Sequence, residues 1–134
     1  MTRLQDWTIR YSAYIAERRS MPFAWGSNDC ASFATNCIAA ITGVDIVDKA
    51  YAGRKSEKDA ARMIKRGGGL RAIADKAVGQ SWSAMYAGVG DLVLFVLDGR
   101  ETLGICNGDE AFAPGESGIV AVPMSAVIDC WRIG

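Results

Sequence analysis

Apolar side chains recur every three or four residues through the first half of the chain, which is the spacing of one helix face. This pattern predicts a first helix that ends at about Arg19, followed by helices over residues 28–42, 56–66 and 70–78. The second of these is the most sharply defined. Its apolar stripe consists of Cys30, Phe33, Ala34, Cys37, Ile38 and Ile41.

Residues with capping chemistry flank these helices. Thr2 and Gln5 have the form of a capping box and are predicted to start the first helix. Asn28 or Asp29 is predicted to cap the second helix, and Gly43 to end it.

The periodicity changes from helix to strand after residue 90. An unbroken apolar run predicts a buried strand over residues 91–97, and turn residues at 98–99 and 107–108 separate it from the strands that follow. Those strands are expected at residues 102–106, 110–113 and 119–122, with a closing element of uncertain type at 127–133. Helices followed by an antiparallel meander predict an α+β fold in which the helices cover one face of the sheet.

Composition narrows the functional classes. The 134 residues are expected to form one domain, 1–134, and Lys plus Arg balance Asp plus Glu at 15 each. This balance argues against a dedicated nucleic-acid binder, which carries a basic face. The longest apolar run, residues 92–97, is too short to cross a membrane. The N-terminal residues lack an apolar signal core, so the chain is expected to be made in a cytoplasm without a signal peptide.

Cys30 is the main candidate for chemistry. It begins a helix, where the helix dipole and free N–H groups are expected to favour the thiolate. The chain contains no histidine, although most cysteine hydrolases use an imidazole as the base. The acidic residues expected nearest to this site are Asp29, Glu101 and Asp109.

A thiol-based metal or redox module is an alternative that would use Cys30, Cys37 and Cys106. The first two are seven residues apart on one helix, hence about 10 Å apart along its axis. That separation is too large for both to bind one metal ion. No metal site and no cofactor are therefore expected, and Cys37, Cys106 and Cys130 are interpreted as small buried residues.

Four segments occur in the order found in a known enzyme family. They are Pro22-Phe-Ala-Trp-Gly26, Asp29-Cys30, Gly90-Asp-Leu-Val-Leu-Phe95 and Thr102-Leu-Gly-Ile105. Together they resemble the NlpC-type family of papain-like cysteine peptidases, which cleave the peptide stems of peptidoglycan. The resemblance implies a papain-like fold with Cys30 at the nucleophile position. It also implies a site lined by Phe23, Trp25, Asp29, Thr102 and Cys106.

A narrower resemblance is to small proteins encoded among the tail genes of long-tailed phages and prophages. It is carried by Leu103-Gly-Ile-Cys106 and Cys130-Trp-Arg-Ile133. It implies a location in the virion, at the phage tail tip. The expected partners are other tail-tip proteins, with peptidoglycan as a second candidate.

The chain departs from the peptidase pattern at three positions. Thr102 stands where the family has its base histidine, residues 111–114 offer no side chain to orient an imidazole, and Phe23 replaces a tyrosine. We therefore expect a non-catalytic NlpC-like structural or binding component of the tail tip. The alternative is a cysteine peptidase or amidase acting on peptidoglycan stems, with Cys30 as nucleophile and an unconventional base.

Overall fold

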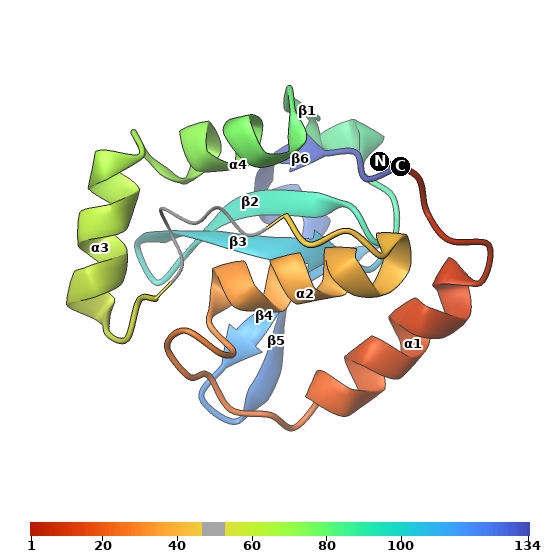
Figure 1. Cartoon of the computed structure of the whole chain (residues 1–134), viewed down its shortest axis with the longest axis horizontal. Helices are drawn as coiled ribbons and strands as arrows, with labels where there is room; N and C mark the ends of the chain where they lie inside the picture. Colours follow the sequence, from red (N-terminus) through yellow and green to blue (C-terminus); the bar gives the residue numbers. More distant parts are fainter. Residues whose placement is uncertain (47–52) are drawn as a thin grey trace.

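The computed structural model describes residues 1–46 and 53–134. Within them, the helices are α1 (Trp7–Arg18), α2 (Cys30–Thr42), α3 (Glu57–Arg66) and α4 (Leu70–Val78). The strands are β1 (Trp82–Ser83), β2 (Leu92–Leu97), β3 (Arg100–Cys106), β4 (Glu110–Gly115), β5 (Gly118–Pro123) and β6 (Val127–Trp131). Two short 3₁₀ helices are η1 (Ala84–Tyr86) and η2 (Met124–Ala126). The predicted α+β class is confirmed (Figure 1). None of the described helices is both long and apolar enough to cross a bilayer.

The strands form one antiparallel sheet with the order β1-β6-β2-β3-β4-β5. β2 to β5 are the predicted meander, and the closing element of uncertain type is a strand, β6, which pairs with β2. Asp98 and Gly99 form the β2–β3 turn with φ values of 52° and 77°, as the type I′ geometry of tight hairpins requires. Strand β1 was not predicted, because two residues are too few for an alternating pattern to be detected.

Side chains are buried on both faces of the sheet. One face packs against α1, α2 and α4, and Leu94, Leu103 and Ile105 are among its contributions to this helix-side core. The other face carries a smaller group, which we call the second-face cluster. Its buried members are Val93, Phe95, Cys106, Ala111, Ala113, Val127 and Cys130. Partly buried residues of η1, β5 and η2 pack against this cluster.

The predicted capping box of Thr2 and Gln5 is wrong, because α1 begins only at Trp7. The residues before it are held in a non-helical form by long-range contacts. The backbone N–H of Leu4 donates a hydrogen bond to the carbonyl of Ile41, at 2.8 Å. Tertiary hydrogen bonds therefore override the local capping signal at this end of the chain.

The N-terminal segment is also fixed by Arg3. Its guanidinium donates to the carbonyl of Val89 at 2.8 Å and that of Ile133 at 2.6 Å, and it forms an ion pair with Asp91 at 2.9 Å. These bonds hold the first residues against the start of β2 and the end of the chain. Figure 1 accordingly shows the two chain ends side by side.

Helix α3 lies at the periphery of the molecule (Figure 1). Ala60 is its one buried residue among those the structure describes. Ser56 caps its first turn by accepting a hydrogen bond from the N–H of Asp59, at 3.1 Å, as the predicted boundary requires. This helix therefore depends on its caps and on a narrow apolar side more than on burial in the core.

Candidate functional site

Asp29 organises the start of α2. Its carboxylate accepts a hydrogen bond from the N–H of Ser32 at 2.9 Å, and the Ser32 hydroxyl accepts one from the N–H of Asp29 at 2.9 Å. The same carboxylate accepts from the N–H of Gly26, at 3.0 Å, which folds the preceding loop onto the helix end. Of the two predicted cap residues, Asn28 and Asp29, Asp29 caps the helix. The predicted end of the helix at Gly43, which has a φ of 76°, is confirmed.

A buried ion pair joins Asp29 to Arg54. The guanidinium donates from Nε to Oδ2 at 2.6 Å and from Nη2 to Oδ1 at 2.5 Å, so the pair is bidentate. Both side chains are buried, with exposed fractions of 1% and 5%. Burial raises the pKa of Asp29, but the hydrogen bonds from Arg54, Ser32 and Gly26 outweigh it, so that the pKa lies below its usual value. This carboxylate is therefore a poor proton acceptor for a neighbouring thiol.

The close approach of the Arg54 backbone requires a glycine at position 26. A Cβ at this position would lie 2.5 Å from the backbone oxygen of Arg54, and its φ of 82° is already in the left-handed region. The Trp-Gly and Asp-Cys motifs therefore serve together to seat Arg54. This role of Arg54 was not predicted, since the residue belongs to no periodic pattern and lies 25 residues from its partner.

Cys30 lies at the first position of α2 and is half-buried. Burial raises the pKa of its thiol and the negative charge of Asp29 raises it further. The backbone N–H of Leu103 and the charge of Arg54 offset these effects only in part. The expectation that the helix terminus favours the thiolate is wrong for this chain, because desolvation outweighs the favourable backbone groups.

An open groove of about 810 Å³ runs beside Cys30, and we call it the Cys30 groove. One wall is formed by the rings of Phe23 and Trp25, packed edge to face with centroids 4.8 Å apart. The other walls are α3 and the β2–β3 hairpin. Glu57 and Arg100, from these two walls, form an ion pair. The remaining lining residues are Ala60, Ala61, Ile64, Lys65, Leu70, Leu97, Asp98, Glu101, Thr102 and Pro114.

Thr102 borders this groove, but its side chain points away from α2. It is the direct cross-strand partner of Phe95, which belongs to the second-face cluster, and directly opposed residues share a face of the sheet. Its hydroxyl donates to the carbonyl of Arg100 at 3.1 Å. By the same alternation Glu101 lies on the Cys30 side of the sheet, and it also lines the groove. Asp109 does not line it.

The structure does not bring the other thiols to Cys30. Cys106 and Cys130 belong to the second-face cluster, on the far side of the sheet, while Cys37 lies within the helix-side core. Burial raises the pKa of all three thiols, to about 12 for Cys37. In the part of the chain that the structure describes, no three His, Cys, Asp or Glu residues are grouped as metal ligands would be. The proposed set of Cys30, Cys37 and Cys106 therefore does not converge on one ion.

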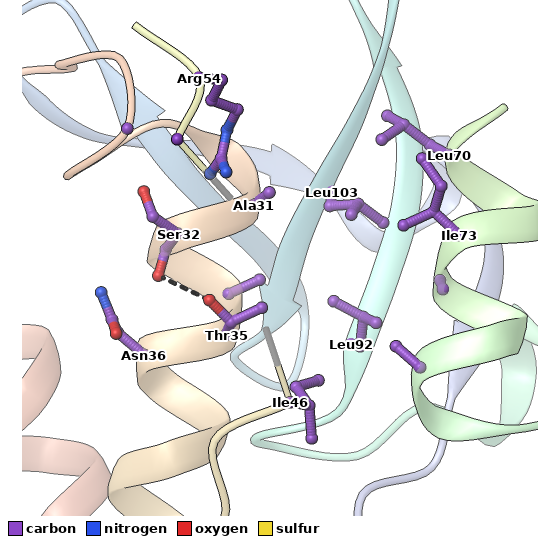
Figure 2. Close-up of a pocket in the computed structure, with 15 residues that line it drawn as sticks. Ala31, Ser32, Thr35, Asn36, Ile46, Arg54, Leu70, Ile73, Leu92 and Leu103 are labelled. Carbon is purple, nitrogen blue, oxygen red and sulfur yellow. Dashed lines mark hydrogen bonds between the residues drawn. The ribbon is translucent and has the colours of Figure 1, made fainter. Parts of the chain in front are cut away.

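A second cavity, of about 200 Å³, lies between α2, α4 and the sheet. Figure 2 shows Leu92 and Leu103 facing it from the sheet, and Leu70 and Ile73 from α4. Ser32, Thr35, Asn36 and Arg54 line it as well. The described lining contains no thiol and no carboxylate. The Cys30 groove is therefore the better candidate for a functional site.

No curated protein matches the chain. A family described as "Domain of unknown function (DUF6950)" matches residues 2–133, which covers the groove, the Asp29–Arg54 pair and the whole sheet. The chain therefore belongs to the DUF6950 family.

Proposed function

We propose that this chain is a non-catalytic NlpC-like domain that serves as a structural or binding component of a bacteriophage tail tip. The observation that supports the absence of catalysis is the environment of the Cys30 thiol. Its thiol has a raised pKa, and the chain contains no histidine to deprotonate it. The placement in a tail tip rests on the resemblance of the segments around Cys30, Cys106 and Trp131 to phage tail proteins.

The surroundings of Cys30 support this loss of reactivity. A cysteine nucleophile requires a thiolate and a group that protonates the leaving amine. Asp29, the neighbouring carboxylate, is held by Arg54 and has a lowered pKa, so it does not exchange protons near neutral pH. Thr102 has a hydroxyl, which does not accept a proton near neutral pH, and its side chain lies on the other face of the sheet.

The Cys30 groove supports a binding role. It has an aromatic wall of Phe23 and Trp25 and an apolar floor, with charges at the rim. Such a combination suits an extended peptide segment, because aromatic rings contribute large contact area and rim charges select among sequences. The peptide could belong to a neighbouring tail protein or to the peptidoglycan stem.

Glu101 gives the hydrolase alternative one favourable observation. Of the three acidic residues predicted near this site, Asp29 is held by Arg54 and Asp109 does not line the groove. Glu101 lines the groove and lies on the same side of the sheet as Cys30. Its side chain is exposed to water. Thiol alkylation of the wild type and of Glu101→Gln between pH 6 and 10 distinguishes the readings. A base at Glu101 predicts fast alkylation at pH 6 that the substitution removes, whereas the non-catalytic reading predicts the same slow rate for both.

Two experiments test the proposal. The purified chain should release no peptides from peptidoglycan, and Cys30→Ala should behave identically to the wild type. Mass spectrometry of purified virions should detect the chain in the tail fraction. Peptide release that is lost in Cys30→Ala contradicts the absence of catalysis, and a gene located outside a tail cluster, or virions that lack the chain, contradict the location.

A further inference from the structure

Basic residues are concentrated in one part of this electrically neutral chain. Residues 54–76 contain eight of the 15 Lys and Arg but three of the 15 Asp and Glu. This segment therefore has a formal charge of +5, and the rest of the chain has −5. Two of these cations, Arg54 and Arg71, form ion pairs with Asp29 and Asp129 outside the segment, so the charge that can direct association lies mainly on α3.

Three of these charges form a line on α3, which we call the α3 basic stripe. Lys58, Arg62 and Arg66 are spaced four residues apart, so they project from one side of the helix over about 12 Å. Ala60 and Ile64, which line the Cys30 groove, lie on the opposite side. The stripe therefore faces outward at the edge of the molecule where Figure 1 shows α3.

The stripe is not neutralised within the described part of the chain. All three side chains are exposed, and among residues 1–46 and 53–134 no acidic group forms an ion pair with them. The two acidic residues of α3 are engaged elsewhere. Glu57 pairs with Arg100 across the groove, and Asp59 accepts a hydrogen bond from the N–H of Lys55 at 3.0 Å.

Like charges four residues apart destabilise a helix. This repulsion occurs twice along the stripe, between Lys58 and Arg62 and between Arg62 and Arg66. Within the part of the chain that the structure describes, the helix buries one residue, Ala60. Lys58 also lies in the first turn, where the helix dipole disfavours a cation. Arg66, in the last turn, is favoured by the same dipole. The two like-charge contacts nevertheless oppose the stability of the helix, as expected of a surface used for contact with a partner.

From these charges we propose that the α3 basic stripe is a docking surface for an acidic protein surface with carboxylates spaced to match it. The acidic surface of a compact protein can contact the whole 12 Å length of the stripe without contacting the rest of the molecule. A nucleic acid or an anionic membrane would contact a larger area than the stripe, and the chain as a whole has no net positive charge to attract it. The inference does not depend on the proposed tail-tip function or on what occupies the Cys30 groove.

The test uses a fluorescein-labelled helical peptide with Glu at three positions four residues apart, and the same peptide with Gln. Fluorescence anisotropy should detect binding of the Glu peptide, weakened by added salt, and no binding of the Gln peptide. Lys58→Gln/Arg62→Gln/Arg66→Gln should weaken binding about tenfold or more, because each exposed ion pair contributes a few-fold. The control Arg19→Gln/Lys76→Gln/Arg132→Gln removes the same charge from exposed sites outside α3, and should change the affinity less than about twofold.

Three results would overturn the proposal. The first is that the wild type does not bind the Glu peptide. The second is an equal loss in the stripe variant and the control, which would reduce the effect to net charge. The third is tighter binding of a single-stranded oligonucleotide or of phosphatidylglycerol vesicles than of the Glu peptide. Circular dichroism provides the folding check, and the stripe variant should be at least as heat-stable as the wild type because the repulsion is gone.

Discussion

Replacing Asp29 by Asn should destabilise the protein more than any single exposed charge change. The substitution removes the charge that compensates Arg54, yet Asn keeps the N-cap because it caps helices about as well as Asp. An amide offers one acceptor oxygen where the carboxylate accepts from both Nε and Nη2 of the guanidinium. The variant therefore keeps the cap on Ser32 while it removes the ion pair and the acceptor for the N–H of Gly26.

The magnitude follows from burial. With exposed fractions of 1% for Asp29 and 5% for Arg54, removal of one partner leaves the other charge away from water. Removal of one partner of a buried ion pair costs about 3–5 kcal/mol of the free energy of unfolding, which is typically about 5–15 kcal/mol in total. Asp29→Ala should cost about 1 kcal/mol more than Asp29→Asn, since it also removes the cap. Arg54→Met should lower the free energy of unfolding by about 3 kcal/mol, because the N–H groups of Ser32 and Gly26 still donate to the carboxylate.

Urea unfolding followed by circular dichroism measures these free energies, and the double variant Asp29→Asn/Arg54→Met completes the cycle. We expect a coupling free energy of at least about 2 kcal/mol, since the two groups compensate each other. Arg71→Met is the matched control. It removes the Arg71–Asp129 ion pair, in which Arg71 is 55% exposed, and should cost no more than about 1 kcal/mol. Additive single losses, or equal costs for Arg54→Met and Arg71→Met, would refute the reasoning.

The same pair predicts an acid-dependent stability. The pKa of Asp29 is lower in the folded chain than its ordinary value of 3.8, so the unfolded chain binds the proton more readily. The stabilisation is therefore present above about pH 3.8 and is lost as the pH falls toward the folded-state pKa. Urea titrations from pH 6 to pH 2.5 should show a steeper loss for the wild type than for Asp29→Asn, and parallel curves would contradict the assignment.

Three further predictions concern the site. Cys30→Ala should lower the free energy of unfolding by about 1 kcal/mol and Phe33→Ala by about 3–5 kcal/mol, both measured by urea unfolding; the reverse order would contradict the packing role of Cys30. The rate of iodoacetamide reaction with Cys30 should keep rising above pH 9, because its pKa is raised, and a plateau below pH 8 would show an activated thiol. Gly26→Ala should destabilise clearly more than Gly53→Ala in thermal melts. Both glycines have a φ near 80°, but only the first would place a Cβ against Arg54, so equal shifts would refute the steric argument.

Local patterns were sufficient for α2 and for the meander. The Asp29 cap, the apolar stripe and Gly43 all lie within the helix they define, and the hairpin turn at Asp98 and Gly99 follows from two adjacent residues. The predicted start of α1 is wrong because distant residues, and not local ones, determine it. Its apparent cap at Thr2 is overridden by the bonds of Arg3 to residues about 90 and 130 positions away, which no local window contains.

The candidate site was predictable only in part. Phe23, Trp25 and Cys30, which the motifs group together, line one groove, and each lies beside a strong turn or cap signal. The alternation of side chains along β3 determines which further residues face the groove. Glu101 lies on the groove side, whereas the side chain of Thr102, one residue later, faces the other way. Cys106 falls on the far face by the same rule, and the partner of Asp29 could not be found without the tertiary structure.

The placement of the three buried thiols gives the protein internal reporters of partial unfolding. Cys37 is shielded by the helix-side core, while Cys106 and Cys130 are shielded on the opposite face of the sheet. A shielded thiol reacts with a modifying reagent only when its surroundings open, so each labelling rate at low denaturant measures the free energy of that opening. Labelling at Cys37 then records separation of α2 from the sheet, and labelling at Cys106 and Cys130 records exposure of the second-face cluster. Native-state thiol exchange can thus establish whether the two faces open as one cooperative unit or as two.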